Sequence, residues 1–120
     1  MSQEKIKILF VDDDNFLRKV YDSELSEQNF DVILAVDGED GLSKARSQDP
    51  DLIILDMIMP KKNGFEVLTA LQSDPATAAI PVIILSNLGQ EADRQKGLDL
   101  GASDYLVKDS TTLGVIINKI

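Results

Sequence analysis

The stretch IKILFVDDD, residues 6–14, joins an apolar run to three consecutive carboxylates. The run over 6–11 is rich in β-branched residues, which is typical of a strand buried on both faces of a parallel sheet. Adjacent carboxylates repel one another, so their place directly after a buried strand needs a physical reason. They either begin a helix, where Asp is favoured, or hold a cation.

Further apolar runs of strand length follow along the chain. We predict strands at 32–36, 52–55, 82–85 and 105–107. Between and after them we expect helices over about 15–28, 37–48, 64–73, 90–100 and 110–120. Alternating strands and helices imply right-handed crossovers. The sequence therefore predicts an α/β, flavodoxin-like fold, a doubly wound five-stranded parallel sheet in the order 2-1-3-4-5 with five helices on its two faces.

The first expected helix carries an apolar stripe. Its members are Phe16, Leu17, Val20, Tyr21 and Leu25. We expect this stripe to pack against the sheet. Asp37 is placed to cap the second helix, and Asn29 and Gly101 are placed to end the first and the fourth.

The composition limits the chemistry that this chain can perform. Its 120 residues suit a single domain, 1–120, and 21 acidic against 12 basic residues give a net charge of −9. This balance argues against direct binding of nucleic acid, whose phosphates require a basic face. Without Cys or His, any chemistry must use carboxylates, hydroxyls and Lys. No apolar run reaches the roughly 20 residues of a membrane span, and we expect a soluble cytoplasmic protein.

Polar side chains follow four of the predicted strands. Asp12, Asp13 and Asp14 follow the first, Asp56 the third, Ser86 the fourth and Lys108 the fifth. Ligands of such sheets bind beyond the carboxyl ends of the strands, between strands 1 and 3. Carboxylates about 5 Å apart repel by roughly 3 kcal/mol at an effective dielectric constant of about 20. Mg²⁺ removes this repulsion and commonly binds a phosphate oxygen as well, so we predict a magnesium site that receives a phosphoryl group.

Each of these residues also has an ordinary structural explanation. The Asp triplet can be a solvated helix start, and Asp56 can end a strand before a turn. Ser86 can cap a helix, and Lys108 can be a solvated surface charge. Their convergence at adjacent strand ends favours a common site.

Four segments carry a resemblance to a known family. They are ILFVDDD at 8–14, DLIILDMIMPKKNGFEVL at 51–68, VIILSN at 82–87 and GASDYLVKD at 101–109. Together they resemble the CheY-like receiver domain of two-component response regulators, over essentially the whole chain. The resemblance implies a phosphorylation-dependent switch that takes a phosphoryl group from a sensor histidine kinase or a phosphotransfer protein.

The resemblance also implies the residues of the reaction. Asp56 would be the phosphoacceptor. Mg²⁺ would be held by Asp13, Asp56 and the backbone carbonyl of Ile58, with Asp12 acting mainly through bound water. The domain would catalyse its own phosphorylation and dephosphorylation without being an independent enzyme. Ile58 and Leu88 flank the reacting centre and are apolar, so we expect slow self-hydrolysis.

Further implied roles concern the phosphoryl group and the signal. Lys108 would pair with phosphoryl oxygens, and Ser86 would donate a hydrogen bond to them. Ser86 and Tyr105 would form the switch, although Tyr105 can also be a half-buried aromatic at the sheet edge. The altered surface would comprise the fourth helix, the fifth strand and the fifth helix, where an unknown downstream protein or a phosphorylation-linked dimer would bind.

One departure and several rival functions accompany the resemblance. Asp109 stands where many receivers have a cis proline, so we expect a trans peptide before it. The main alternative is a pseudo-receiver, which binds proteins independently of phosphorylation. An aspartate-nucleophile phosphatase would need a second Asp at position 58, and a flavodoxin-like cofactor carrier would need a phosphate loop that is not acidic.

Overall fold

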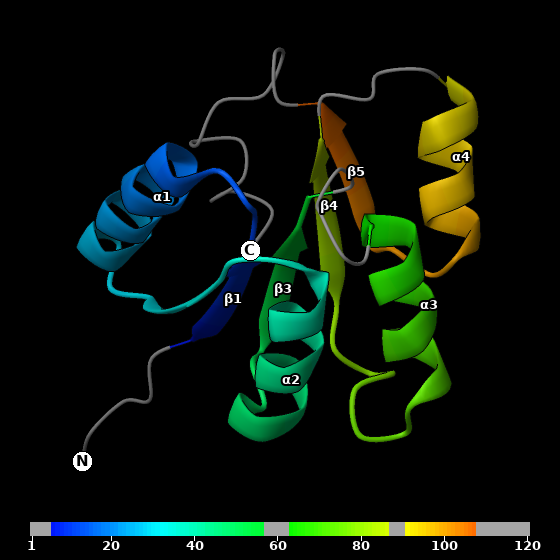
Figure 1. Ribbon diagram of the computed structural model, residues 1–120, viewed down its shortest axis with the longest axis horizontal. Coiled ribbons are helices and arrows are strands. Elements are labelled where there is room, and N and C mark those ends of the chain that lie inside the picture. Colours follow the sequence, from blue (N-terminus) through cyan, green and yellow to red (C-terminus); the bar gives the residue numbers. More distant parts are fainter. Residues whose placement is uncertain (1–5, 57–62, 87–90, 108–120) are drawn as a thin grey trace.

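The computed structural model describes residues 6–56, 63–86 and 91–107. Its strands are β1 (Lys7–Val11), β2 (Asp31–Ala35), β3 (Leu52–Leu55), β4 (Val82–Ser86) and β5 (Asp104–Val107). Its helices are α1 (Asn15–Glu27), α2 (Gly38–Gln48), α3 (Gly64–Ser73) and α4 (Glu91–Asp99). The strands form one parallel sheet in the order β2-β1-β3-β4-β5 (Figure 1). The predicted fold class and strand order are confirmed, and the helix expected over 110–120 lies outside the described residues.

Apolar side chains cover both faces of the sheet, because successive residues of a strand point to opposite sides. Leu9 and Val11 of β1 join a cluster with the buried residues of α2 and α3. Ile8 and Phe10 join a second cluster with Leu25 of α1. The fully buried strand residues explain why the sequence shows continuous apolar runs instead of alternation.

Two members of the α1 stripe, Leu25 and Tyr21, pack with residues of the sheet as expected, but Phe16 does not. Tyr21 packs against Phe10 of β1, with ring centroids 4.7 Å apart and ring planes tilted by 55°. Phe16, in contrast, is 71% exposed, so its predicted packing on the sheet is wrong. It stands in the first turn of α1.

Local polar contacts set the ends of the helices. Asp14 caps α1 by accepting hydrogen bonds from two backbone amides, and Asp37 caps α2 as predicted. Asn29 and Gly101 adopt positive φ angles of 70° and 107° directly after α1 and α4, which confirms them as the ends of these helices. Within the described ranges, none of the helices has the length and apolarity needed to cross a membrane.

Candidate acidic site at the carboxyl ends of the strands

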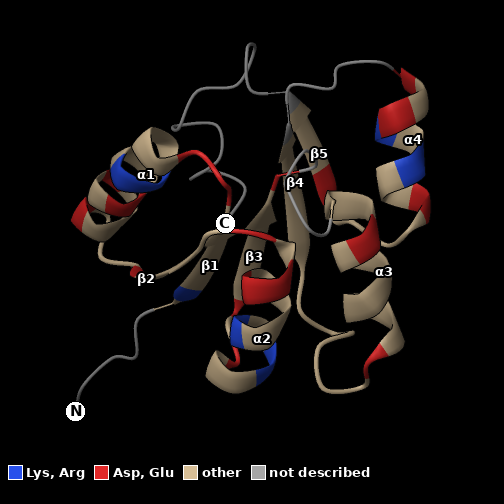
Figure 2. Cartoon of the chain, in the orientation of Figure 1, with Lys and Arg blue, Asp and Glu red and all other residues tan. Residues whose placement is uncertain are grey.

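Three carboxylates converge where β1 and β3 end. Each of Asp12, Asp13 and Asp56 offers an oxygen, and these oxygens all lie within 4.8 Å of one another. Asp12 and Asp56 are buried, at 1% and 6% exposure, whereas Asp13 is exposed. The acidic segment that joins β1 to α1 is visible in Figure 2. The site therefore has a buried base and an open rim.

Backbone pairing places the two buried carboxylates side by side. Val11, the last residue of β1, is in register with Leu55, the last residue of β3. One residue further on, the amide of Asp56 donates to the carbonyl of Val11 at 3.0 Å, and the amide of Asp12 donates to the carbonyl of Ala35 at 3.2 Å. The parallel register of the central strands thus brings together residues that are far apart in sequence.

The turn after β1 is held by its own polar groups. The amide of Asp14 donates to Oδ1 of Asp12 at 2.9 Å. Asp14 Oδ1 in turn accepts from the amides of Phe16 and Leu17 at 2.9 and 3.2 Å. The three consecutive carboxylates therefore differ in position, since Asp14 faces the helix while Asp12 and Asp13 face Asp56.

This donor set fits a hard divalent cation. Three anions within 4.8 Å of one another repel by roughly 3 kcal/mol per pair at an effective dielectric constant of about 20. Mg²⁺ takes oxygen ligands in an octahedron, whose oxygens lie about 3 to 4 Å apart. Asp12, Asp13 and Asp56 supply only oxygens at a compatible spacing, so these residues would hold Mg²⁺.

Comparison with known proteins agrees with this geometry. Residues 8–119 match the family described as the response regulator receiver domain. The chain belongs to this family. Two relatives are the probable transcriptional regulator ycf27 of Cyanophora paradoxa, 42% identical over 108 residues, and the DNA-binding dual master transcriptional regulator RpaA of Synechocystis, 44% identical over 102 residues. The matches cover 90% and 85% of this chain but only 44% and 42% of those proteins, so the chain spans less than half of their length.

Solved structures show the same receiver fold. The Vibrio cholerae chemotaxis protein CheY4 superposes with a TM-score of 0.89 at 28% identity, covering 97% of this chain and 96% of that one. The BeF₃-activated N-terminal receiver domain of Klebsiella pneumoniae RstA gives 0.87 at 27% identity, covering 94% and 93%. The resemblance stated from the sequence is confirmed.

The other predicted site residues of this receiver domain are placed only in part. Ser86 ends β4 and is paired with Val107, the last residue of β5 before Lys108. Strands β3, β4 and β5 are parallel neighbours, so Ser86 and Val107 lie with Asp56 at the carboxyl ends of the strands. Lys108, Ile58 and Leu88, like the peptide before Asp109, lie outside the described residues.

The predicted switch aromatic is buried against α4. Tyr105 is 4% exposed, so it is not a half-buried residue of the sheet edge. A Cβ atom added to Gly97 of α4 would lie 3.0 Å from Cδ2 of Tyr105 and 2.7 Å from Cδ1 of Ile84. Only glycine lets α4 approach the sheet this closely. Sequence reasoning missed this contact because it depends on tertiary packing.

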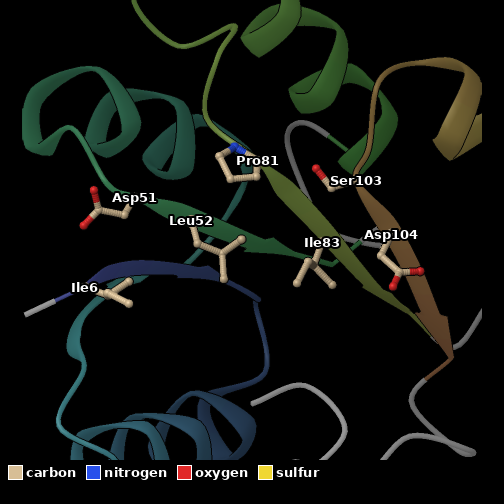
Figure 3. A pocket seen from close by; sticks show the side chains of 7 residues that line it. All are labelled: Ile6, Asp51, Leu52, Pro81, Ile83, Ser103 and Asp104. Carbon is tan, nitrogen blue, oxygen red and sulfur yellow. The ribbon is translucent and has the colours of Figure 1, made fainter. Parts of the chain in front are cut away.

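The receiver domain also has a hollow at the amino ends of the strands, opposite the carboxylate cluster (Figure 3). Its volume is about 650 Å³. It is lined by Ile6, Asp51, Leu52, Pro81, Ile83, Ser103 and Asp104. Because the strands are parallel, this hollow and the carboxylate cluster are separated by the length of the sheet.

Proposed function

We propose that this receiver domain is a phosphorylation-dependent signalling switch, with Asp56 as the phosphoacceptor and Mg²⁺ as the cofactor. The observation that carries the proposal is the convergence of Asp12, Asp13 and Asp56 within 4.8 Å, in a chain of this family. The sequence contains no His. The phosphohistidine donor would therefore lie outside these 120 residues, on a sensor histidine kinase or a phosphotransfer protein.

Asp56 would attack from the base of the site, where it is buried. One of its carboxylate oxygens would form a bond to phosphorus while the P–N bond of the donor breaks and its electron pair returns to the imidazole. When bound, Mg²⁺ would neutralise charge on the carboxylates and on the phosphoryl oxygens. Burial of Asp12 and Asp56 excludes water and strengthens their electrostatic interactions. By their match to the family, Lys108 and Ser86 would bind phosphoryl oxygens, and the carbonyl of Ile58 would complete the metal ligands.

The donor would approach over the start of α1. Phe16 is 71% exposed and is separated from Asp13 by only two residues. Exposed aromatic side chains beside polar groups are favoured anchors of protein interfaces. We assign Phe16 to the contact with the phosphodonor protein.

The signal would leave through α4 and β5. Gly97 is the only buried residue of α4, and it contacts Tyr105 of β5. A helix anchored at so few buried positions is a low-stability element that a nearby change can remodel. The relatives named as transcriptional regulators suggest transcriptional control as the output. With a net charge of −9, this domain would act on DNA through a partner domain or protein, and not through its own surface.

A small-molecule phosphodonor tests the proposal without a known kinase. The chain is incubated with acetyl phosphate and Mg²⁺, and intact mass is measured. Wild type should gain one phosphoryl group, and Asp56→Asn should gain none. An unmodified wild type would instead support the pseudo-receiver, which binds partners without phosphorylation.

A further inference from the structure

Arg18 reaches back from α1 to the acidic site. Its Nη1 donates to the backbone carbonyl of Asp12 at 2.8 Å, and its Nη2 donates to Oδ1 of Asn15 at 3.1 Å. The guanidinium is planar and presents its donors in a fixed fork, so two bonds at once fix its orientation. The side chain is partly buried. Neither sequence spacing nor the family resemblance had singled out this residue.

Arg18 completes the support of the turn that presents the metal ligands. The backbone amide of Asp12 donates a hydrogen bond to the carbonyl of Ala35 in β2 at 3.2 Å. The carbonyl of Asp12 is held by Arg18, and its carboxylate is held by the amide of Asp14. Of these three contacts, Arg18 is the one that ties Asp12 to the body of α1. The direction of the Asp12 and Asp13 side chains therefore depends on it.

Two effects of Arg18 on a bound cation oppose each other. Its positive charge repels Mg²⁺, so removing it would tighten binding. Its hydrogen bond fixes the turn, so removing it would loosen the ligand set and weaken binding. Both of its hydrogen bonds go to neutral acceptors, a peptide carbonyl and a side-chain amide, and not to a metal-binding carboxylate. This geometry favours the second effect.

We propose that Arg18 is a positioning residue of the magnesium and phosphoacceptor site, which aligns Asp12 and Asp13 through the backbone of the turn. This inference rests on the proposed function. Residues that orient metal ligands typically contribute 10- to 100-fold to metal affinity. Because the hydrogen bonds of Asp12 to the carbonyl of Ala35 and from the amide of Asp14 remain, we expect the low end of this range, about tenfold.

The test uses the full chain and three variants. Arg18→Met keeps the length of the side chain but removes the fork and the charge, whereas Arg18→Lys keeps the charge and removes the fork. Arg94→Met is the matched control, since Arg94 is exposed on α4 and its loss changes the net charge equally. Magnesium affinity is measured by isothermal titration calorimetry, and the rate of phosphorylation by acetyl phosphate is followed as a function of Mg²⁺ concentration.

Arg18→Met should bind Mg²⁺ about tenfold more weakly, Arg18→Lys should bind it more weakly than wild type, and Arg94→Met should match wild type. At saturating Mg²⁺ the phosphorylation rate of Arg18→Met should return toward the wild-type rate, which a merely unfolded protein would not do. Equal or tighter binding by Arg18→Met would overturn the inference. If that variant does not fold, wild-type affinity in Arg18→Lys overturns it. Absence of Mg²⁺ binding by the wild type would instead overturn the proposed function.

Discussion

Carboxylates lie at both the amino ends and the carboxyl ends of the strands, but the two sets are held differently. At the amino ends, Asp51 accepts from the amide of Lys7 at 2.9 Å and Asp104 accepts from the amide of Tyr105 at 2.8 Å. Asp51 directly precedes β3 and Asp104 begins β5. These two strands lie on either side of β4, so the two residues are about 10 Å apart. At the carboxyl ends, three carboxylates share a space of 4.8 Å.

This difference separates structural from functional carboxylates. A single Asp that accepts a backbone hydrogen bond lowers the energy of the folded chain by itself. Clustered carboxylates raise that energy until a cation binds. A polypeptide gains nothing in stability from such a cluster, and the burial of Asp12 and Asp56 within it favours a bound cation. The hollow at the amino ends of the strands is large, but the residues that line it show no comparable convergence of charge.

Asp56→Asn should give the largest effect. It should abolish phosphorylation by acetyl phosphate because the nucleophile is gone. It should also raise the free energy of unfolding without divalent ions by about 1 to 3 kcal/mol, since one of three clustered charges is removed without a change of volume. Intact mass and urea unfolding in the presence of a chelator measure the two effects.

Asp51→Asn is the matched control at the amino ends of the strands. Its amide oxygen can still accept from Lys7, so the free energy of unfolding should change by no more than about 0.5 kcal/mol. Equal stabilisation by both substitutions would mean that only the net charge of −9 matters. The contrast between the carboxylates at the two ends of the strands would then be lost.

Magnesium should stabilise the wild type by mass action. At a concentration 100 times its dissociation constant, the free energy of unfolding should rise by about 2.7 kcal/mol. Asp51→Asn should keep this gain and Asp56→Asn should lose most of it. Thermal unfolding with and without Mg²⁺ checks the prediction, and an unmoved wild-type melting temperature would contradict the metal site.

Gly97→Ala should destabilise the domain by about 1 kcal/mol. The new methyl group would lie 2.7 Å from Ile84 and 3.0 Å from Tyr105, and such overpacking costs about 1 to 3 kcal/mol. The helix propensity of Ala returns about 1 kcal/mol of this cost. Gly97→Ala should destabilise a Tyr105→Ala background less than it destabilises the wild type, because one of the two side chains that the new methyl group meets is gone. Urea unfolding of the single and double variants tests this coupling, and additive effects would place the strain elsewhere.

The sequence was sufficient for the fold because the central strands β1, β3 and β4 are buried on both faces. Continuous apolar runs then stand out from the helices, and the carboxylates at their ends follow from the strand order. Asp37 and Asn29 were predictable for a different reason, since capping depends on local chemistry alone.

Side-chain contacts between elements could not be predicted in the same way. Periodicity placed Phe16 on the apolar stripe of α1, but it does not show how far the neighbouring elements cover that stripe. Arg18 has a long side chain whose direction is fixed only by the fold. The contact of Gly97 depends on the distance between α4 and β5. Each of these depends on tertiary geometry, to which local spacing is blind.

Phe16→Ala should separate protein donors from small ones. Loss of an exposed aromatic anchor should slow transfer from a phosphorylated kinase or phosphotransfer protein by about tenfold, equivalent to about 1.4 kcal/mol. The rate with acetyl phosphate should stay unchanged, because the carboxylates are untouched. The free energy of unfolding should change by less than about 0.5 kcal/mol. Equal slowing with both donors would show that Phe16 shapes the site itself.

The smallest expected effect concerns Asp74, a single carboxylate after α3. Its hydrogen bond from the amide of Ala76, and next the hydrogen bond from Arg46 at 2.9 Å, hold its pKa below the usual value. A lowered pKa means that its contribution to stability is complete above the unfolded pKa of about 4 and is lost as the pH falls through the folded value. Arg46→Met should move the pKa upward but leave it below the usual value, because the bond from Ala76 remains. Carbon NMR titration of the Asp74 carboxyl measures this shift, and an unchanged pKa would mean that the ion pair does not persist in solution.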